Sequence, residues 1–216
     1  MGGAFPGRSA EPSRIGVPLR ERREQLGISL RQIARRIGVS ASLISQIERD
    51  KVTPSVSTLY ALVTELGLTM GDVFGDVQPP SPRLPATPEA GHVTERDERA
   101  VLNLASGVRW ERLTPSTDPF VEFLYVVYDV GSASCDEDSL VTHGGDEYGY
   151  VVSGRLGVRI GFDEYELGPG ASISFNSSSP HRLWAIGAKP VHAIWVVVGR
   201  QADPRATAGQ PPPAVS

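Results

Sequence analysis

Residues 29–51 read SLRQIARRIGVSASLISQIERDK, and their spacing predicts two short helices joined by a tight turn. The first of these helices has one apolar stripe with the spacing i, i+3, i+4, i+7, formed by Leu30, Ile33, Ala34 and Ile37. Ser29 is suited to cap its N-terminus, Gly38 to end it, and Ser40 to cap the next helix. The local pattern therefore predicts a helix-turn-helix unit.

The second predicted helix has an apolar face and a polar face. Leu43, Ile44 and Ile47 turn inward. The small and amide side chains that stay outside are those of Ala41, Ser42, Ser45 and Gln46. Such a helix is suited to the major groove of DNA, where side chains reach the base edges. An ordinary corner between two helices is the alternative, but the short turn, the paired caps and the basic residues nearby favour DNA binding.

Over about Val17–Phe74 the sequence resembles the lambda-repressor/Cro-like (XRE) helix-turn-helix family, whose DNA-binding unit is an all-α bundle of five helices. The resemblance adds one helix before the motif, at Val17–Leu26, and two after it, within Ser55–Phe74. It also implies a structural role for Arg23 and Glu48, because residues at these positions usually form a partly buried ion pair in this family.

The same resemblance assigns DNA contacts by position. Base-edge contacts fall on Ala41, Ser42, Ser45 and Gln46, and contacts to backbone phosphates fall on Ser29, Arg31 and Ser40. Gln46 is suited to pair with adenine, a contact worth about 1–3 kcal/mol of discrimination between bases. The sequence does not define which bases are read.

The charge of the chain is divided unevenly. Residues 1–75 contain ten Lys and Arg and seven Asp and Glu, a net charge of +3, whereas the remainder contains eleven and eighteen, a net charge of −7. A basic segment attracts phosphate in a salt-sensitive way, and an acidic segment is repelled by it. The distribution favours double-stranded DNA as the partner of the N-terminal part alone.

Length and composition set the broad class of protein. A chain of 216 residues with 40% hydrophobic residues can bury one large or two small cores. No run of 18 apolar residues occurs, and the N-terminus lacks the apolar region of a secretory signal, so we expect no membrane segment and a cytoplasmic location. Cys135 is the one cysteine, which excludes an internal disulfide and fits a reducing compartment.

Composition divides the chain into five segments. Residues 1–14, rich in Gly, Pro and Ser, are predicted to form a disordered arm, and residues 201–216, rich in Pro, Ala and Gly, a disordered tail. Five prolines make residues 76–92 a semi-stiff linker. This linker separates a helix-turn-helix domain at residues 15–75 from a second domain at residues 93–200.

The second domain is rich in short β-forming runs separated by Gly, Pro, Ser and Asp. The predicted strands are Val101–Ala105, Val108–Leu113, Phe120–Val130, Tyr148–Val152, Leu156–Ile160, Ala171–Phe175, Arg182–Ile186 and Val191–Val198. Many short strands with turn signals between them and no helical period indicate an antiparallel sandwich or barrel.

Two segments of this domain contain most of its candidate functional residues. Thr142–Gly154 reads THGGDEYGYVVSG, and Gly168–Leu183 reads GPGASISFNSSSPHRL. They resemble the two motif regions of the cupin family, and the resemblance extends over about Val108–Val198. It implies an all-β barrel of the double-stranded β-helix, or jelly-roll, type.

The cupin resemblance identifies candidate ligand-binding residues. The positions that match the family pattern are His143, Glu147 and Gly154 in the first motif and His181 in the second. Val141 replaces the first His of the family, and Ala185 stands where the family often has Asn. Residues 144–146 can turn the chain so that His143 and Glu147 share an inner wall, which His181 can approach from a distant strand.

Two imidazoles and one carboxylate suit Fe(II) with open coordination positions, and Zn, Ni or Mn are also compatible with them. These ions are therefore the candidate cofactors of the barrel. The alternative is that His143, Glu147 and His181 bind an organic ligand directly or contact only one another, because regulators of this architecture often have a metal-free barrel.

Two functions of different classes are compatible with this domain order. In the first, the helix-turn-helix domain of a transcriptional regulator binds an operator and the cupin domain senses a small-molecule effector. We expect a homodimer in that case, because one recognition helix reads only a few base pairs and two half-sites lie about 34 Å apart. In the second, the protein is a mononuclear non-haem iron oxygenase or epoxidase of the helix-turn-helix–cupin type.

The first domain discriminates between these functions. An oxygenase has no need for an intact recognition helix, yet the caps, the outward Ser and Gln side chains and the local positive charge are all retained. Agreement across these levels favours the regulator, and no residue is assigned a catalytic role. The effector and the sign of regulation are not defined by the sequence.

Overall fold

The structure is a computed structural model that describes residues 14–74, 92–118 and 120–199. The predicted arm and linker lie outside these residues, apart from Arg14 and His92 at their boundaries, and the predicted tail lies wholly outside them. The domain boundaries proposed from composition at these segments therefore stay predictions.

The N-terminal part is helical, as predicted. Within the described residues its helices are α1 (Gly16–Gln25), α2 (Leu30–Arg36), α3 (Ala41–Ile47), α4 (Val56–Leu66) and α5 (Met70–Phe74). The two predicted serine caps form, and Ser55 caps α4 in the same way: the side-chain oxygens of Ser29, Ser40 and Ser55 accept hydrogen bonds from backbone N–H groups three residues later. Each cap satisfies a backbone donor that the first turn of a helix leaves without a partner.

One hydrophobic core joins these helices. Its most completely buried side chains are Leu19, Ile33, Ile44, Ile47, Leu59, Leu62, Leu66 and Val73. The start of α1 lies directly on the end of α3, because a Cβ added at Gly16 would lie 2.6 Å from the carbonyl oxygen of Ile47. The side chain of Asp50, just beyond α3, accepts a hydrogen bond from the Gly16 backbone N–H at 2.8 Å. The first helix therefore holds the position of α3.

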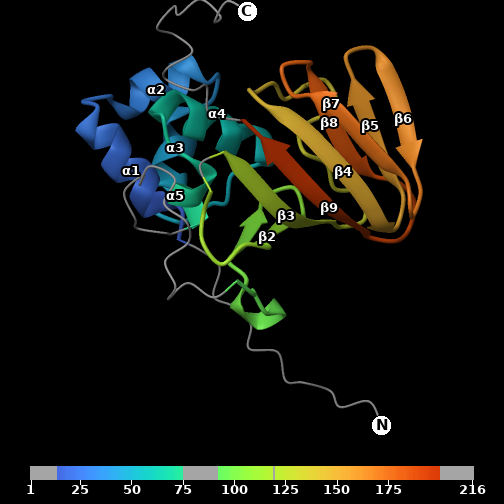
Figure 1. Ribbon diagram of the computed structural model, residues 1–216. Helices are drawn as coiled ribbons and strands as arrows, with labels where there is room; N and C mark the ends of the chain where they lie inside the picture. Colours follow the sequence, from blue (N-terminus) through green and yellow to red (C-terminus); the bar gives the residue numbers. More distant parts are fainter. Residues whose placement is uncertain (1–13, 75–91, 119, 200–216) are drawn as a thin grey trace, which may run out of the picture.

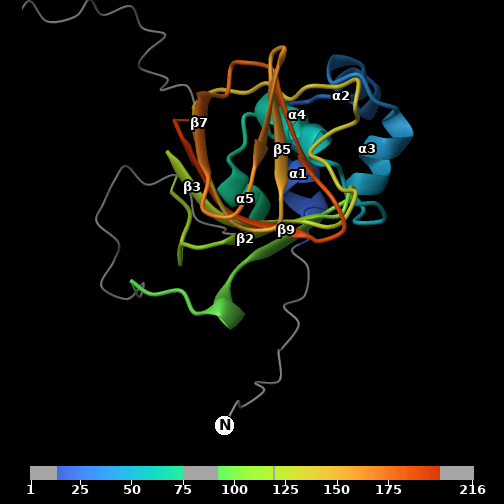
Figure 2. The same ribbon diagram turned by 90° about the vertical axis from the view of Figure 1, so that its right-hand side faces the viewer.

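The C-terminal part is an antiparallel β-structure, as predicted. Its strands are β1 (Val101–Leu104), β2 (Val108–Arg112), β3 (Val121–Tyr128), β4 (Asp146–Ser153), β5 (Leu156–Ile160), β6 (Asp163–Leu167), β7 (Ser172–Asn176), β8 (His181–Ala185) and β9 (Val191–Val198), and a short 3-10 helix precedes them at Arg96–Glu98. One sheet has the order β1-β2-β3-β9-β4-β7, and the other has the order β6-β5-β8. The two sheets curve around a common interior (Figure 2).

The strand β6 was not predicted from the sequence. Four of its five residues are exposed, and its sequence DEYEL contains only two apolar residues, Tyr165 and Leu167. It pairs with β5 in a hairpin, so backbone hydrogen bonding rather than burial defines it. The strand β4, by contrast, is half-buried: its side chains alternate between the two faces of the sheet, and those of Glu147 and Val151, together with Gly149, face inward.

The helix α4 lies between the two parts of the molecule (Figure 1). The backbone N–H of Ser57 donates a hydrogen bond to the carbonyl oxygen of Ser134 at 3.3 Å, and that of Ala105 donates to the carbonyl oxygen of Pro54 at 2.9 Å. The guanidinium of Arg112 lies 5.7 Å from the centre of the Phe74 ring. The helical bundle therefore packs directly on the barrel. Among the described residues, no helix has the length and apolar composition needed to cross a bilayer.

Candidate DNA-binding surface and cupin cavity

The predicted DNA-contact residues lie on α2, on α3 and at their caps, and none of them is fully buried. Ser29, Arg31, Ser40 and Ser42 are exposed, and Ala41, Ser45 and Gln46 are half-buried. They lie at the N-terminal ends of α2 and α3 and along the outer side of α3. Ile44 and Ile47 are fully buried beneath them. The side chains that could reach DNA therefore stand on a helix whose opposite face is fixed in the core.

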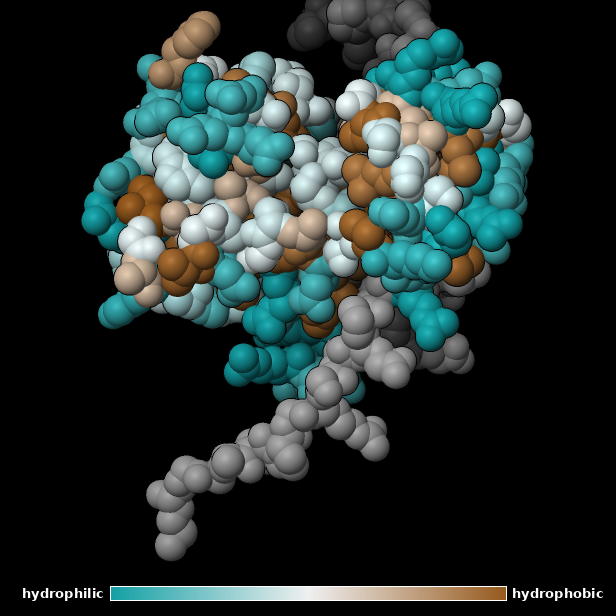
Figure 3. Space-filling view, turned by 180° about the vertical axis from the view of Figure 1, so that it is seen from behind, coloured by the Kyte–Doolittle hydropathy of each residue, from teal (hydrophilic) through white to brown (hydrophobic). Residues whose placement is uncertain are grey.

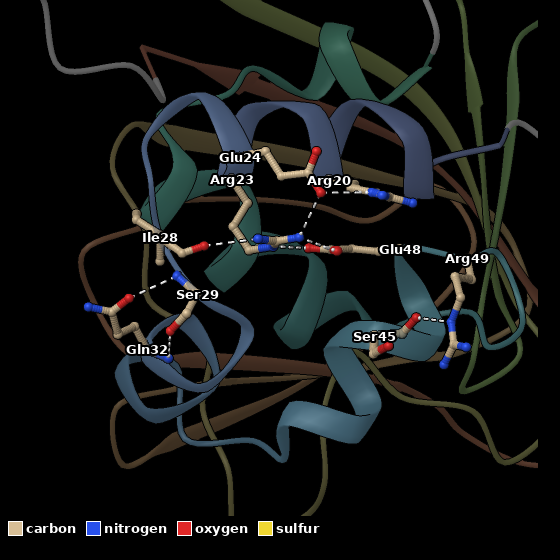
Figure 4. A network of polar contacts seen from close by, with 9 residues as sticks. All are labelled: Arg20, Arg23, Glu24, Ile28, Ser29, Gln32, Ser45, Glu48 and Arg49. Atoms are coloured by element: carbon tan, nitrogen blue, oxygen red, sulfur yellow. Dashed lines mark hydrogen bonds and ion pairs between the residues drawn. The ribbon is translucent and has the colours of Figure 1, made fainter.

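Arg23 and Glu48 lie together beneath this surface. The guanidinium Nε and Nη2 of Arg23 donate to the two carboxylate oxygens of Glu48 at 2.5 and 2.9 Å, and Nη1 donates to the carbonyl oxygen of Ile28 at 2.9 Å (Figure 4). Both side chains are buried, and the hydrogen bond to Glu48 raises the pKa of Arg23. This bidentate pair joins α1 to the end of α3.

The candidate residues of the second domain form one buried cluster. The Nε2 atom of His143 lies 2.9 Å from Oε1 of Glu147, and the Nε2 atom of His181 lies 3.2 Å from the same oxygen. The donor atoms of the three side chains lie within 4.8 Å of one another. Glu147 is on β4 and His181 begins β8, so the two sheets of the barrel bring them together.

Backbone contacts define how the two imidazoles are oriented. Nδ1 of His143 lies 3.0 Å from the carbonyl oxygen of Gly144, and Nδ1 of His181 lies 2.9 Å from that of Ser179. A carbonyl oxygen only accepts, so each Nδ1 carries a proton. In the neutral ring Nε2 is then the lone-pair nitrogen, and in both rings it is Nε2 that approaches Glu147. Histidines that bind metals are commonly oriented in this way.

Glu147 is a buried carboxylate with strong partners. Its Oε2 accepts a hydrogen bond from the indole N–H of Trp195 at 2.7 Å. Burial by itself raises the pKa of Glu147, but the positive charges of His143 and His181, when both rings are protonated, and the Trp195 indole together lower it to about 2. The carboxylate is therefore charged at neutral pH. Its Oε1, which faces both Nε2 atoms, accepts no well-aligned hydrogen bond from the described residues.

The geometry of the cluster fits a divalent metal ion. Metal bonds about 2.1 Å long at right angles to each other separate two ligand atoms by about 3 Å. This separation agrees with the distances of 2.9 and 3.2 Å between Oε1 of Glu147 and the two Nε2 atoms. Val141, which replaces the first His of the cupin pattern, is buried and lines the same cavity, so it offers no further ligand.

The cluster faces a partly enclosed cavity with aromatic walls. Trp110, Tyr128 and Trp195 line it from the barrel, and Val56 and Tyr60 line it from α4. The space that the centre of a water molecule can occupy is about 30 Å³, which is room for about two waters. The cavity is therefore closed in part by the helical domain.

Two aromatic residues near the cluster lie differently with respect to the cavity. Strand alternation turns Trp184 to the other side of β8, where it contacts Gly157 and Arg182. Tyr60 lines the cavity, although no motif in the sequence marks it. A signal for it exists, because Val56 and Tyr60 have i, i+4 spacing outside the apolar stripe that faces the helical core.

Comparison with known proteins agrees with both domains. Residues 19–73 match the helix-turn-helix family, and residues 124–197 match the cupin domain family. The chain is 30% identical to the HTH-type transcriptional regulator PuuR of Escherichia coli (strain K12) over 168 residues, which are 77% of this chain and 84% of that protein. It is 26% identical to the HTH-type transcriptional regulator SutR of the same organism over 178 residues, which are 82% and 90% of the two chains.

A solved structure shares the fold. The HTH_3 family transcriptional regulator from Vibrio cholerae superposes with a TM-score of 0.60 at 22% identity, covering 88% of this chain and 97% of that chain. The predicted two-domain fold is thereby confirmed. With both domains matched and most of the length of known regulators covered, the chain belongs to the helix-turn-helix transcriptional regulators that carry a cupin domain, and it is a DNA-binding regulator.

Proposed function

We propose that this regulator reads an operator through α3 and that a metal ion or small-molecule effector bound in the cupin cavity controls its binding. The observation that supports the proposal most directly is the construction of α3. Its N-terminus is capped by Ser40, its end is held by the Arg23–Glu48 pair, and its outer side chains are left accessible. A DNA partner and the lone buried thiol of Cys135 both suit a cytoplasmic protein.

In this proposal the seven surface residues divide into two groups. Ala41, Ser42, Ser45 and Gln46 contact base edges, and Ser29, Arg31 and Ser40 contact phosphates. Arg49, which follows α3, donates from Nε to the carbonyl oxygen of Ser45 at 2.9 Å and so places positive charge beside the same helix. Base contacts determine which sequence is bound, whereas phosphate contacts strengthen binding to every sequence.

A substitution at Gln46 tests this assignment. The Gln46→Ala variant should bind the selected operator about 5- to 150-fold more weakly, corresponding to the 1–3 kcal/mol of a bidentate amide–adenine contact. Its binding to non-operator DNA at the same salt concentration should be unchanged. The matched control is Gln25→Ala, an exposed amide on α1. An equal loss of specific and non-specific binding in Gln46→Ala would remove Gln46 from the base-reading group.

The ligand of the cavity is proposed from its donor atoms. His143, Glu147 and His181 would hold Fe, Ni, Zn or Mn, which can polarise or coordinate a bound effector. Protein purified after supplementation with each metal should retain one ion per chain, and His181→Ala should lose it. Metal contents far below one per chain in every case would exclude the metal and leave direct binding of an organic effector.

We also propose a homodimer, since one recognition helix reads too few base pairs for a specific site. The outer face of the six-stranded sheet supports this, because its exposed side chains include Phe123, Tyr148, Tyr150, Val152 and Val198. By contrast, on the side of the molecule shown in Figure 3, hydrophobic residues form separate groups among hydrophilic ones. A face that buries such apolar side chains against a second copy would set the spacing of the two recognition helices.

A mononuclear iron oxygenase is the second candidate, and one observation favours it. Two imidazole nitrogens and one carboxylate oxygen converge beside a cavity, which is the ligand set of many Fe(II) oxygenases. Bound iron would supply oxygen activation in such an enzyme. Uptake of dioxygen by the Fe(II)-loaded chain when small organic acids or phosphonates are added would support it, and uptake no faster than that of the His181→Ala variant would exclude it.

A further inference from the structure

We propose that Tyr60, a residue of the DNA-binding domain, is part of the effector site and transmits its occupancy to the recognition helix. The inference rests on the regulator function proposed above and names the element through which that regulation acts. The side chain of Tyr60 projects from α4 into the wall of the cupin cavity, where it is 8% exposed.

The first step is the contact between the two domains at the cluster itself. The ring centre of Tyr60 lies 4.7 Å from that of His143 and 5.3 Å from that of Trp110, with both ring pairs tilted by 42°. His143 is one of the three cluster residues. A ligand that fixes or shifts the His143 ring therefore changes the surface on which Tyr60 packs.

The second step is the double role of α4. Leu59, Leu62 and Leu66 are buried in the core that also contains Ile44 and Ile47 of α3. Val56 and Tyr60 line the cavity of the barrel. The two sets lie on one helix of three turns, so a displacement of Tyr60 moves the helical core as well.

The third step joins the far end of α4 to the rest of the DNA-binding domain. The guanidinium Nε of Arg22 donates to the carbonyl oxygen of Leu66 at 3.0 Å, and Arg36 pairs with Glu65 at 2.5 Å. These contacts tie α4 to α1 and α2. The helix α1 in turn holds the end of α3 through Arg23 and Glu48, which completes a contiguous path from the cavity to the DNA-binding surface.

The size of the cavity determines which ligands bind without rearrangement. With Tyr60 in place there is room for about two waters or one metal ion. A metal ion can therefore bind without moving Tyr60, and it orders His143 beneath the ring. An organic ligand with more than a few heavy atoms must displace some of the lining side chains, which include Val56 and Tyr60 of α4.

Hydrogen exchange of the full-length chain with and without Ni²⁺ tests this inference. In the wild-type protein, saturating Ni²⁺ should slow exchange of the α4 amides about 5- to 150-fold, the range expected for a coupling of this kind. At saturating Ni²⁺, Tyr60→Ala should still hold one ion per chain, because the three ligand side chains remain, and exchange in its barrel strands should still slow. In Tyr60→Ala, Ni²⁺ should change the exchange rates of the α4 amides less than twofold.

Two controls separate coupling from packing. Tyr60→Phe keeps the ring and should keep the response of α4, and Thr64→Ala, on the exposed side of the same helix, should also keep it. If Tyr60→Ala does not fold, Tyr60→Leu removes the ring with a smaller loss of volume. An α4 response of wild-type size in the variant without the ring would overturn the inference. The inference would also be overturned if Ni²⁺ does not bind the wild-type protein, or if it binds without slowing amide exchange in α4.

Operator binding is measured separately, so that the two proposals can fail independently. If α4 responds to Ni²⁺ but the protein selects no DNA sequence, the operator proposal fails and the role of Tyr60 stands. If the protein selects an operator but α4 does not respond, DNA reading stands and the role of Tyr60 is wrong.

Discussion

The buried pair formed by Arg23 and Glu48 is the strongest polar contact between α1 and the end of α3. Glu48→Ala should lower the free energy of unfolding by about 3–5 kcal/mol, because the Arg23 charge is left buried without its partner. Urea denaturation monitored by circular dichroism measures the change. The control is Glu21→Ala, which removes an exposed carboxylate from α1 and should leave the midpoint close to that of the wild type. Equal midpoints for the two variants would contradict the structural role of the pair.

Cys135 should behave as an inert thiol. It is 5% exposed, and burial raises the pKa of its thiol, so the reactive thiolate is scarce at neutral pH. We expect iodoacetamide to alkylate the native protein at least tenfold more slowly than the protein unfolded in urea, as measured by mass spectrometry. Rates that agree within a factor of two would show an accessible thiol and contradict this expectation.

At the residue scale, the sequence predicted the cluster but not its surroundings. The residues His143, Glu147 and His181 could be found because they occupy fixed positions in two recognisable motifs. The hydrogen bond from Trp195 to Glu147 and the contact of Tyr60 with His143 join residues that are 48 and 83 positions apart. Spacing within a motif contains no information about such long-range packing.

At the scale of elements, the helices were predicted more closely than the strands. Three helix starts depend on a local signal, a serine side chain such as that of Ser29, which accepts a hydrogen bond from the backbone N–H three residues later. The strand β6 has no such signal, since its pairing with β5 is made by the backbone and its side chains are mostly exposed. A strand that is defined by backbone pairing and buries few side chains is therefore the one that the sequence left out.

The packing of β4 against β9 gives a testable prediction at this scale. A Cβ added at Gly149 would lie 2.1 Å from Cζ3 of Trp195, the residue that donates to Glu147. Gly149→Ala should therefore cost about 1–3 kcal/mol of stability and weaken Ni²⁺ binding, because the indole is pushed away from the carboxylate. Gly168→Ala is the control, since a Cβ there has no neighbour within 4 Å. Thermal unfolding and calorimetry of both variants measure the difference, and identical behaviour would contradict the predicted overlap.

At the scale of the whole molecule, the prediction from sequence was least complete. The domain types followed from composition and motifs, but their contact through α4 did not, because Val56 and Tyr60 face residues that are at least 50 positions away in the chain. A fragment ending near Ala90 should consequently expose these two side chains, be less stable than the full chain and bind operator weakly. A fragment with the full-length operator affinity would argue against any contribution of the barrel.

The proposed dimer surface can be tested by introducing one charged side chain into it. Tyr150→Glu places a carboxylate on the apolar outer face of the six-stranded sheet, where Tyr150 is 49% exposed, and should convert the dimer to monomers in sedimentation experiments. Tyr165→Glu makes the same change at a tyrosine of similar exposure on β6, in the other sheet, and should leave the dimer intact. Monomers in both variants, or dimers in both, would place the interface elsewhere.

The most direct test of the account is selection of genomic DNA fragments by the purified full-length protein at a fixed salt concentration. Two recognition helices related by a twofold axis should enrich an inverted repeat whose half-sites are centred about one helical turn, roughly 34 Å, apart. The Gln46→Ala variant should lose that enrichment while still binding DNA in bulk. Selection that enriches no sequence above the input library, in the presence or absence of metal, would contradict the claim that α3 reads an operator.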